Sequence, residues 1–219
     1  MSNVKLVHST GNGTIIAAPA ANPSSNITLK VPSTTGTAGQ ALKVASANHS
    51  STNAELEWGG IGKVLQVVST TRTDTFSEAS IDEGDHSGAA ISVSITPTAA
   101  SSKVFVIASL NIGLDTDNEI SFAFFRGGSI LTGIIGDAAG SRTRTSFGGK
   151  CESSSATENL SGFYLDSPST TSATTYDCRL SHGHNGGNRT MYLNRSHSDT
   201  DADQDSRFAS TITVVEIGA

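Results

Sequence analysis

The stretch NITLKVPSTTGTAGQALKV, residues 26–44, contains two short patterns of alternating apolar and polar residues, joined by a run of Ser, Thr and Gly. Alternation with a period of two predicts β-strands, because successive side chains of a strand point to opposite faces. Hardly any side chain in the stretch is large enough to build a core. Ordering its residues costs more conformational entropy than the burial of so few apolar side chains recovers. We therefore expect the stretch to need packing from outside itself.

The same pattern extends over residues 1–59, which are small and polar and are punctuated by proline. Short strand patterns lie at residues 13–19, 26–32, 40–46 and 54–60. Two explanations are open: a flexible linker, or a core that is shared between identical copies. The alternation of apolar residues and the closing Leu-Glu-Trp favour the shared core.

From residue 60 onward the strand patterns are longer and richer, and they predict an all-β fold. They lie at residues 62–71, 89–97, 102–113, 119–128, 129–136, 145–150, 159–167, 174–181, 190–196 and 207–219. Their spacing predicts a two-sheet antiparallel sandwich of the jelly-roll kind over residues 60–219. The segments KVFVIASL and ISFAFF are apolar on both faces, which indicates central strands or an interface.

Composition excludes several classes of function. The net charge of −6 leaves no basic surface for nucleic-acid binding. The sequence contains no apolar run of membrane-spanning length and no hydrophobic export signal, so we expect neither membrane insertion nor secretion. It contains no G-x-S-x-G, H-E-x-x-H or convincing Cys-His arrangement, and we therefore expect no enzymatic activity. Cys151 and Cys178 are expected to be reduced thiols, with a single disulfide as the alternative.

Several segments of the sequence indicate a family. The first part contains APAANPSSNITLKVPSTTGTAGQALKV and then LEWG, and the second contains GKVLQVV, VSITPTAASSKVFVIASL, FYLDSPSTTSATTYDCRL, MYLNRSHSDTDAD and STITVVEI. Together they cover nearly the whole chain, and they resemble tail-fibre-like virion proteins of bacteriophages, marine ones in particular.

The resemblance implies a homotrimeric virion protein that is made in the host cytoplasm. Residues 1–59 would contact other virion proteins and form an interwoven β-stalk, and residues 60–219 would form a head that binds a host cell-surface glycan or protein. The alternative is a head decoration, cement or head-fibre protein of the capsid. A secreted lectin-like module would require an export signal, and a prophage or tail-like bacteriocin would use the same kind of fibre.

Two polar loops, residues 182–189 and 197–205, are the candidate receptor-binding tip. The residues expected to contact a receptor are His182, His184, Asn185, Asn188, Arg189 and His197. The His182–His184 pair is expected to lie in a plain surface loop, and a metal-binding pair of the kind found at some phage fibre tips is the alternative. The single tryptophan, Trp58, is expected to plug the joint between stalk and head, with a sugar-stacking platform as the alternative.

Four aspartates alternate along the second loop: Asp199, Asp201, Asp203 and Asp205. In an extended strand they would share one face, where repulsion between carboxylates favours a bound cation, and oxygen ligands at this density suit Ca²⁺. The turn glycine and the distal glutamate of an EF-hand are missing. We therefore favour a solvated acidic loop and expect no cofactor, and a calcium site at these four aspartates is the alternative.

Overall fold

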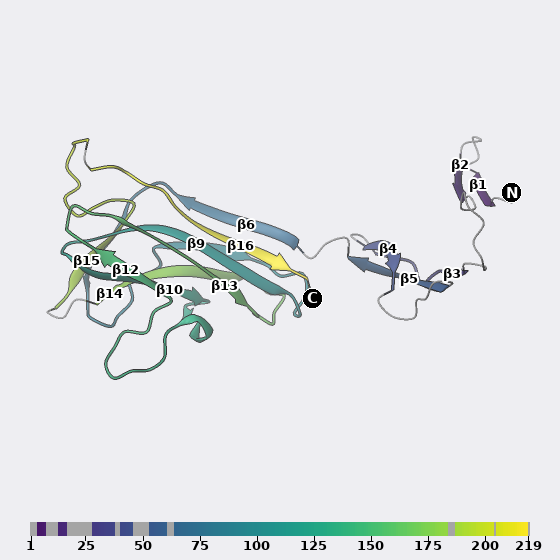
Figure 1. Ribbon diagram of the computed structural model, residues 1–219, viewed down its shortest axis with the longest axis horizontal. Helices are drawn as coiled ribbons and strands as arrows, with labels where there is room; N and C mark the ends of the chain where they lie inside the picture. The colour runs from purple at the N-terminus through teal and green to yellow at the C-terminus, as the bar shows by residue number, and fades with distance from the viewer. Residues whose placement is uncertain are drawn as a thin grey trace. The chain divides into compact units, whose positions relative to one another are not determined.

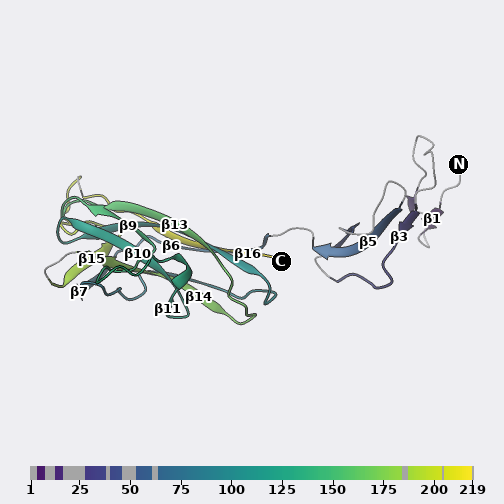
Figure 2. The same cartoon turned by 60° about the horizontal axis from the view of Figure 1, so that its bottom comes forward.

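The computed structural model describes residues 4–7, 13–16, 28–37, 40–45, 53–60, 64–183, 187–203 and 205–218 (Figures 1 and 2). The chain divides into two compact units, Met1–Ile61 and Gly62–Ala219, called unit 1 and unit 2 below. This division lies two residues beyond the boundary expected from the sequence. The described residues form β-strands and one 3-10 turn, which confirms the all-β class. Among them, no helix has the length and hydrophobicity that crossing a membrane requires.

Unit 1 contains a β-hairpin and a small mixed sheet. The strands are β1 (Val4–Val7), β2 (Gly13–Ile16), β3 (Thr28–Lys30), β4 (Gln40–Val44) and β5 (Asn53–Gly60). β1 and β2 pair antiparallel. In the sheet β5 is central, with β3 parallel to it on one side and β4 antiparallel on the other. Strands were expected at the positions of β2 to β5, whereas β1 was not predicted.

The register of the small sheet places its large apolar side chains on one face. Leu42 lies opposite Trp58 and Val44 opposite Leu56, so these four side chains share a face of the sheet. Charged residues occupy the other face, where Lys43 Nζ lies 3.2 Å from Glu57 Oε1. Away from Trp58, the apolar face has no cover within the described residues: Leu42 is 44% exposed and Val44 is 53% exposed.

Trp58 is partly covered by the loop that follows β3. Its Nε1 donates a hydrogen bond to the carbonyl oxygen of Thr34 at 2.7 Å. A Cβ atom on Gly36 would lie 2.6 Å from the indole ring, so the loop can approach the ring only because residue 36 is a glycine. Trp58 therefore packs within unit 1, and its expected role at the joint stays a prediction.

Unit 2 is an antiparallel β-sandwich. Its elements are β6 (Val64–Arg72), β7 (Phe76–Ile81), β8 (Ile91–Ile95), β9 (Lys103–Leu114), β10 (Asn118–Arg126), β11 (Ser129–Ile130), η1 (Thr132–Ile134), β12 (Phe147–Cys151), β13 (Glu158–Asp166), β14 (Thr174–His182), β15 (Arg189–Leu193) and β16 (Ser210–Ile217). One sheet has the order β13–β9–β16–β6. Toward one end of this sheet, β15 takes the place of β16 beside β9, and β7 takes the place of β6 beside β15. The other has the order β12–β10–β14–β8, with β11 also on the outer side of β10. This is the strand order of a jelly roll.

Two expectations about the strands of unit 2 need correction. The sequence predicted a strand over residues 129–136, but the extended part ends with β11 at Ile130 and the chain then turns through η1. β7 was not predicted, because its residues are mostly small and its pairing with β15 is irregular. The remaining strands lie where the sequence pattern placed them, within one or two residues at most ends.

The core lies between the two sheets. β9 contributes an inward row of five side chains that are at most 1% exposed: Val104, Val106, Ala108, Leu110 and Ile112. Across from them, Phe122 and Phe124 of β10 pack with Phe147 of β12 at ring-centroid distances of 5.4 to 6.1 Å. β9 and β10 are both central strands, which confirms the interpretation of the two doubly apolar segments.

The two cysteines lie in this core as free thiols. Cys151 is in β12 and Cys178 in β14, and neither is exposed. Burial raises the pKa of both thiols above the ordinary value. The reduced form expected from the sequence is the one in the structure.

The buried carboxylate of Glu216 stabilises the turn between β8 and β9 by accepting hydrogen bonds. Glu216 has no exposed surface, and it accepts hydrogen bonds from Gln66 Nε2 at 2.6 Å and from the backbone N and Oγ1 of Thr98, each at 2.7 Å. Burial alone would raise the pKa of Glu216, but these hydrogen bonds outweigh burial and lower the pKa to about 2. The side chain is therefore ionised at neutral pH.

Candidate functional site

Unit 2 has two ends, which the positions of β6 and β16 define. At the entry end β6 begins and β16 ends, and at the far end β6 runs into β7 and the chain returns to β16. The far end carries residues 194–203 and 205–209, called the far-end loop. β15 and β16 both pair antiparallel with β9, along successive parts of that strand. The far-end loop therefore leaves the sheet at the end of β15 and rejoins it at the start of β16, beside the same strand.

Asn194 fixes the base of the far-end loop. It has a φ of 66°, in the left-handed region that asparagine tolerates better than most residues. Its Nδ2 donates to the carbonyl oxygens of Arg72 and Asp74 at 2.8 and 2.9 Å, and its Oδ1 accepts from Ser210 Oγ at 2.6 Å. One buried side chain therefore joins the turn between β6 and β7 to both sides of the loop.

Asp205 organises the interior of the far-end loop. It accepts hydrogen bonds from Ser196 Oγ at 3.1 Å, Ser198 Oγ at 2.9 Å and the backbone N of Thr200 at 2.9 Å, and also from Thr200 Oγ1. The hydrogen bonds from Thr200 are the main cause that lowers the pKa of Asp205 to about 2. The carboxylate therefore holds the loop closed.

The calcium prediction finds no structural support. Asp199 is paired with Arg207 at 2.8 Å and with Arg195 at 3.2 Å, and Asp205 is occupied by the loop hydroxyls. The described residues of this segment, 199–203 and 205, form a loop with bends and a turn rather than a strand, so the four aspartates do not share one face. The described residues contain no group of three His, Cys, Asp or Glu side chains placed to hold a metal ion.

The expected receptor-binding residues differ in their burial, and some lie outside the described residues. His182 belongs to β14, is 1% exposed, and has its Nε2 2.9 Å from the carbonyl oxygen of Ile81. The prediction that it contacts a receptor is therefore wrong. His184 and Asn185 lie outside the described residues, and so does the proposed His182–His184 pair.

The other three expected residues lie at the far end of unit 2. Asn188 is exposed and donates from Nδ2 to the carbonyl oxygen of Ser80 at 3.3 Å. Arg189 is half-buried at the start of β15. His197 is exposed, with its Nδ1 2.7 Å from the hydroxyl of Tyr192. These side chains stay candidates for contact with a receptor.

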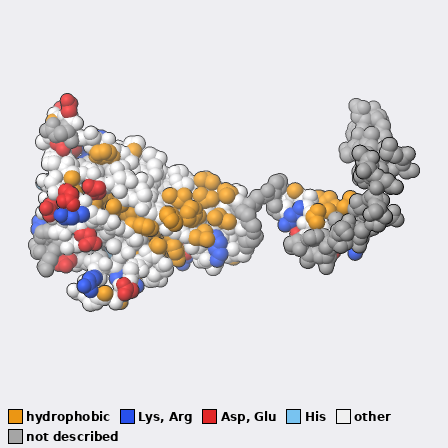
Figure 3. Space-filling view, in the orientation of Figure 1, with side chains coloured by type: hydrophobic (Ala, Val, Ile, Leu, Met, Phe, Trp, Pro, Cys, Tyr) orange, Lys and Arg blue, Asp and Glu red, His pale blue; other side chains and the backbone are white. Residues whose placement is uncertain are grey.

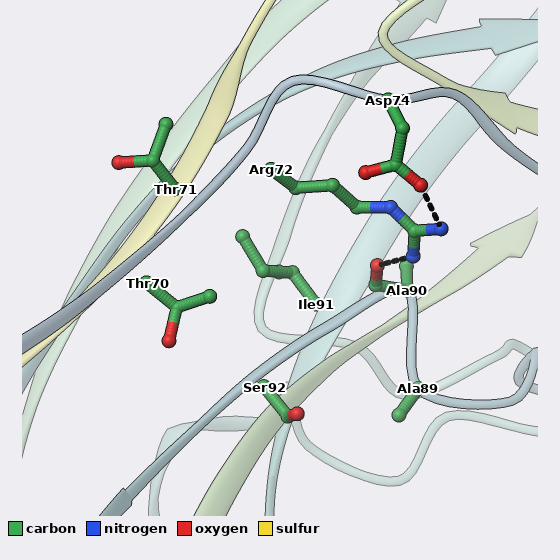
Figure 4. Close-up of a pocket in the computed structure, with 8 residues that line it drawn as sticks. All are labelled: Thr70, Thr71, Arg72, Asp74, Ala89, Ala90, Ile91 and Ser92. Atoms are coloured by element: carbon green, nitrogen blue, oxygen red, sulfur yellow. Dashed lines mark hydrogen bonds and ion pairs between the residues drawn. The ribbon is translucent and has the colours of Figure 1, made fainter.

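A hollow of about 270 Å³ lies between β6 and β8 (Figure 4). The residues that line it are Thr70, Thr71, Arg72, Asp74, Ala89, Ala90, Ile91 and Ser92. Arg72 spans the hollow: its Nη1 donates to the carbonyl oxygen of Ala90 at 2.6 Å, and its Nη2 donates to Asp74 Oδ2 at 3.0 Å. The guanidinium thus connects the two sheets at their shared edge.

Polar groups in the wall of the hollow are left without partners. Arg72 Nε is buried and has no hydrogen-bond partner within the described residues. The hydroxyls of Thr70 and Ser92 form no hydrogen bond within the same part of the chain. Ile91 and Ala90 also line the hollow, but they are only 4% and 0% exposed and offer little apolar surface. The accessible part of the hollow is therefore mainly polar.

The outer face of the β13–β9–β16–β6 sheet is apolar at the entry end. Leu165, Phe105, Val215 and Val67 lie side by side across its strands. We call the whole set the entry-end apolar face; its members are Val64, Leu65, Val67, Phe105, Ile107, Phe163, Leu165 and Val215. Figure 3 shows hydrophobic side chains gathered near the start of β6 and the end of β16. Phe163 is 63% exposed and Val67 is 59% exposed.

Toward the far end the same face becomes polar. Its outward residues there are Ser69, Ser109, Asn111, Asn159, Ser161, Thr211 and Thr213. Several bond to one another, as in the contact of Ser161 Oγ with Ser109 Oγ at 3.1 Å. The entry half of the face is therefore suited to contact with another apolar surface, and the far half to contact with water.

Sequence reasoning missed both surfaces for different reasons. The entry-end apolar face had a signal, because KVFVIASL is apolar on both faces and an interface was one of the explanations considered. The hollow had none, because Thr70, Arg72 and Ser92 come from separate strands and are ordinary residues in each. Comparison with known proteins adds no assignment: no family model matches the chain, and no curated protein matches its sequence.

Proposed function

We propose that this chain is a non-enzymatic subunit of a homotrimeric bacteriophage fibre. Unit 1 would contact other virion proteins and build the stalk, and unit 2 would bind a glycan or protein on the host cell surface. The proposal joins the resemblance of the sequence to tail-fibre-like proteins with the surfaces described above. The virion would carry the protein on its tail.

One observation carries the proposal: the uncovered apolar face of the β3–β5–β4 sheet. Leu29 is 60% exposed and Val31 is 73% exposed, in addition to Leu42 and Val44. Ala45 is the one buried hydrophobic side chain among those described in unit 1. Exposed apolar faces of this kind mark contacts with other chains. Three identical sheets that turn these faces toward a common axis would bury all of them and close the assembly.

Unit 2 supports the same arrangement. Its entry-end apolar face begins at Val64, only a few residues after β5 ends at Gly60. The far half of the same outer face is polar, so the three heads would not associate there. Three heads on one fibre would each offer a weak site, and simultaneous engagement would raise the overall affinity for a cell without improving any single contact.

The far-end loop supports a role in attachment. It is a long polar excursion on a rigid sandwich, and binding residues are often found on such loops. Asn194 and Asp205 hold it in one conformation, which reduces the entropy cost of binding. His197 on this loop and Asn188 in the neighbouring connection are exposed to a receptor.

Electron microscopy of virions labelled with antibodies against unit 2 tests the proposal. We expect label at the tail. Label on the capsid faces would overturn the tail-fibre proposal and support the head-decoration alternative. In parallel, purified full-length chain should bind host cells and compete with virions for adsorption, and failure to compete would contradict the attachment role.

A further inference from the structure

We infer that the hollow between β6 and β8 binds one neutral sugar ring of a larger glycan. The inference rests on the proposed attachment function and names the class of ligand that unit 2 would recognise. The ligand would not contact the exposed residues of the far-end loop or the histidines suggested by the sequence.

The hollow has hydroxyls without hydrogen-bond partners among the described residues. Those of Thr70 and Ser92 can both donate and accept hydrogen bonds. Arg72 Nε also lacks a partner, but it has no accessible surface, so a ligand would contact the hydroxyls instead. A sugar ring presents several hydroxyls close together and matches such a mixed set.

The two charged side chains of the hollow neutralise each other. The guanidinium of Arg72 is already paired with Asp74, so the hollow carries no net charge from these two groups. A carboxylate or phosphate ligand would have to compete with Asp74, and an amine would be repelled by Arg72. An uncharged ligand meets neither obstacle. The second oxygen of Asp74, Oδ1, remains an acceptor for a ligand hydroxyl.

The size and the position of the hollow suit a single sugar ring. A volume of about 270 Å³ lies just below the usual range of ligand pockets, which suits one ring rather than a longer ligand buried whole. The hollow lies at the edge of the sandwich, because β6 pairs with β16 alone and β8 with β14 alone among the described strands. A glycan chain can therefore leave the hollow on either side of the ring.

The rigidity of the site supports the inference. Asn194 holds the backbone carbonyls of Arg72 and Asp74, and Arg72 in turn holds Ala90. The walls of the hollow are thus fixed before a ligand arrives, which lowers the cost of binding.

Saturation-transfer NMR on the full-length chain tests the inference. The probes are methyl glycosides of neutral hexoses and N-acetylhexosamines, compared with glucuronate and glucosamine. We expect at least one neutral glycoside to bind with a Kd on the order of 1 mM, more tightly than the acid or the amine. Absence of binding by every neutral glycoside at about 10 mM, or a preference for a charged sugar, would overturn the inference.

Matched variants locate the site. Ala89→Trp should fill the hollow and abolish binding, whereas Ala100→Trp, at another exposed alanine, should leave binding unchanged. Thr70→Val should weaken binding roughly 5-fold through loss of one hydrogen bond, whereas Thr211→Val on the outer face should not. Binding that survives Ala89→Trp would place the sugar elsewhere and contradict the inference.

Cell adsorption separates this inference from the proposed function. If the Ala89→Trp chain loses sugar binding but still adsorbs to cells, the hollow is a sugar site and another surface carries attachment. If the unchanged chain binds sugars but does not adsorb, the attachment proposal fails and the hollow inference stands. If it adsorbs without binding any neutral sugar, only the hollow inference fails.

Discussion

The sheet of unit 1 and the sandwich of unit 2 follow the same sequence pattern and differ in what covers their apolar faces. In unit 2, the inward row of β9 is covered by the opposite sheet, and Leu110 has no exposed surface. In unit 1, the corresponding face is exposed at Leu42 and Val44. Alternation therefore decides where strands form, whereas stability depends on a second layer. In unit 1 that layer has to come from another chain.

The largest expected difference appears when the two units are separated. A chain of residues 62–219 should remain folded and melt cooperatively, because its core lies within one chain. A chain of residues 1–61 should be largely unfolded at low concentration, because the burial available to it cannot offset the ordering entropy. Circular dichroism with thermal melting measures both. A cooperative melt of residues 1–61 as a monomer would remove the contrast.

Matched leucine truncations test the same contrast at single residues. Leu110→Ala should destabilise unit 2 by about 2–5 kcal/mol, because it leaves a cavity in a sealed core. Leu42→Ala should leave the denaturant midpoint of unit 2 unchanged and should weaken association of the full chain. Chemical denaturation and sedimentation of both variants provide the readouts. Unaltered association of Leu42→Ala would show that this face is not part of the interface.

The buried carboxylate of Glu216 gives unit 2 a specific dependence on pH. Its folded-state pKa of about 2 lies below the ordinary value of 4.5. Ionised Glu216 therefore stabilises the fold above about pH 4.5, and this contribution is lost as the pH falls toward 2. Glu216→Gln should cost about 1–3 kcal/mol at pH 7. The gap from the unchanged chain should narrow between pH 4.5 and 2.

Asp205→Asn is the control for this pH dependence. It removes a carboxylate whose pKa is also about 2 but which lies in the far-end loop rather than in the sandwich. We expect a smaller loss of unfolding free energy than for Glu216→Gln, measured by denaturation at the same pH values. An equal or larger loss would show that the loop contributes to the stability of the sandwich as much as the buried network does.

The smallest effect concerns the thiols. Cys151 and Cys178 are buried and the pKa of each is raised, so alkylation in the native state should be slow at pH 8. Both should react at the rate of a free thiol after unfolding in guanidinium. Mass spectrometry of timed reactions measures this. Fast native labelling of either cysteine would show that the core of unit 2 opens more readily than its packing indicates.

The sequence predicted the local features of the fold well and the long-range ones less well. The alternation at residues 40–46 and 54–60 is a local signal, and it located β4 and β5. That Leu42 lies opposite Trp58 could not be predicted, because register depends on pairing between segments. β7 was missed because Phe76–Ile81 is weakly apolar and contains Ser80 with a φ of 60°.

The candidate sites show the same division. His182 was assigned to a loop because glycine and asparagine follow it, but β14 extends to it and buries it against Ile81. The calcium hypothesis required the aspartates of residues 199–205 to share one face of an extended strand, whereas Asp205 accepts hydrogen bonds from Ser198 and Thr200 within a closed loop. The hollow at Arg72 depends on distant strands meeting, which no local pattern encodes.

Sedimentation equilibrium of the full-length chain tests most directly whether unit 1 is completed by other copies. We predict a mass three times the 22.5 kDa of one chain. Hydrogen exchange on the same sample should show protected amides in β4 and β5. A mass of 22.5 kDa at every concentration, with those amides still protected, would contradict the account, because a single chain would then order a sheet that has no cover of its own.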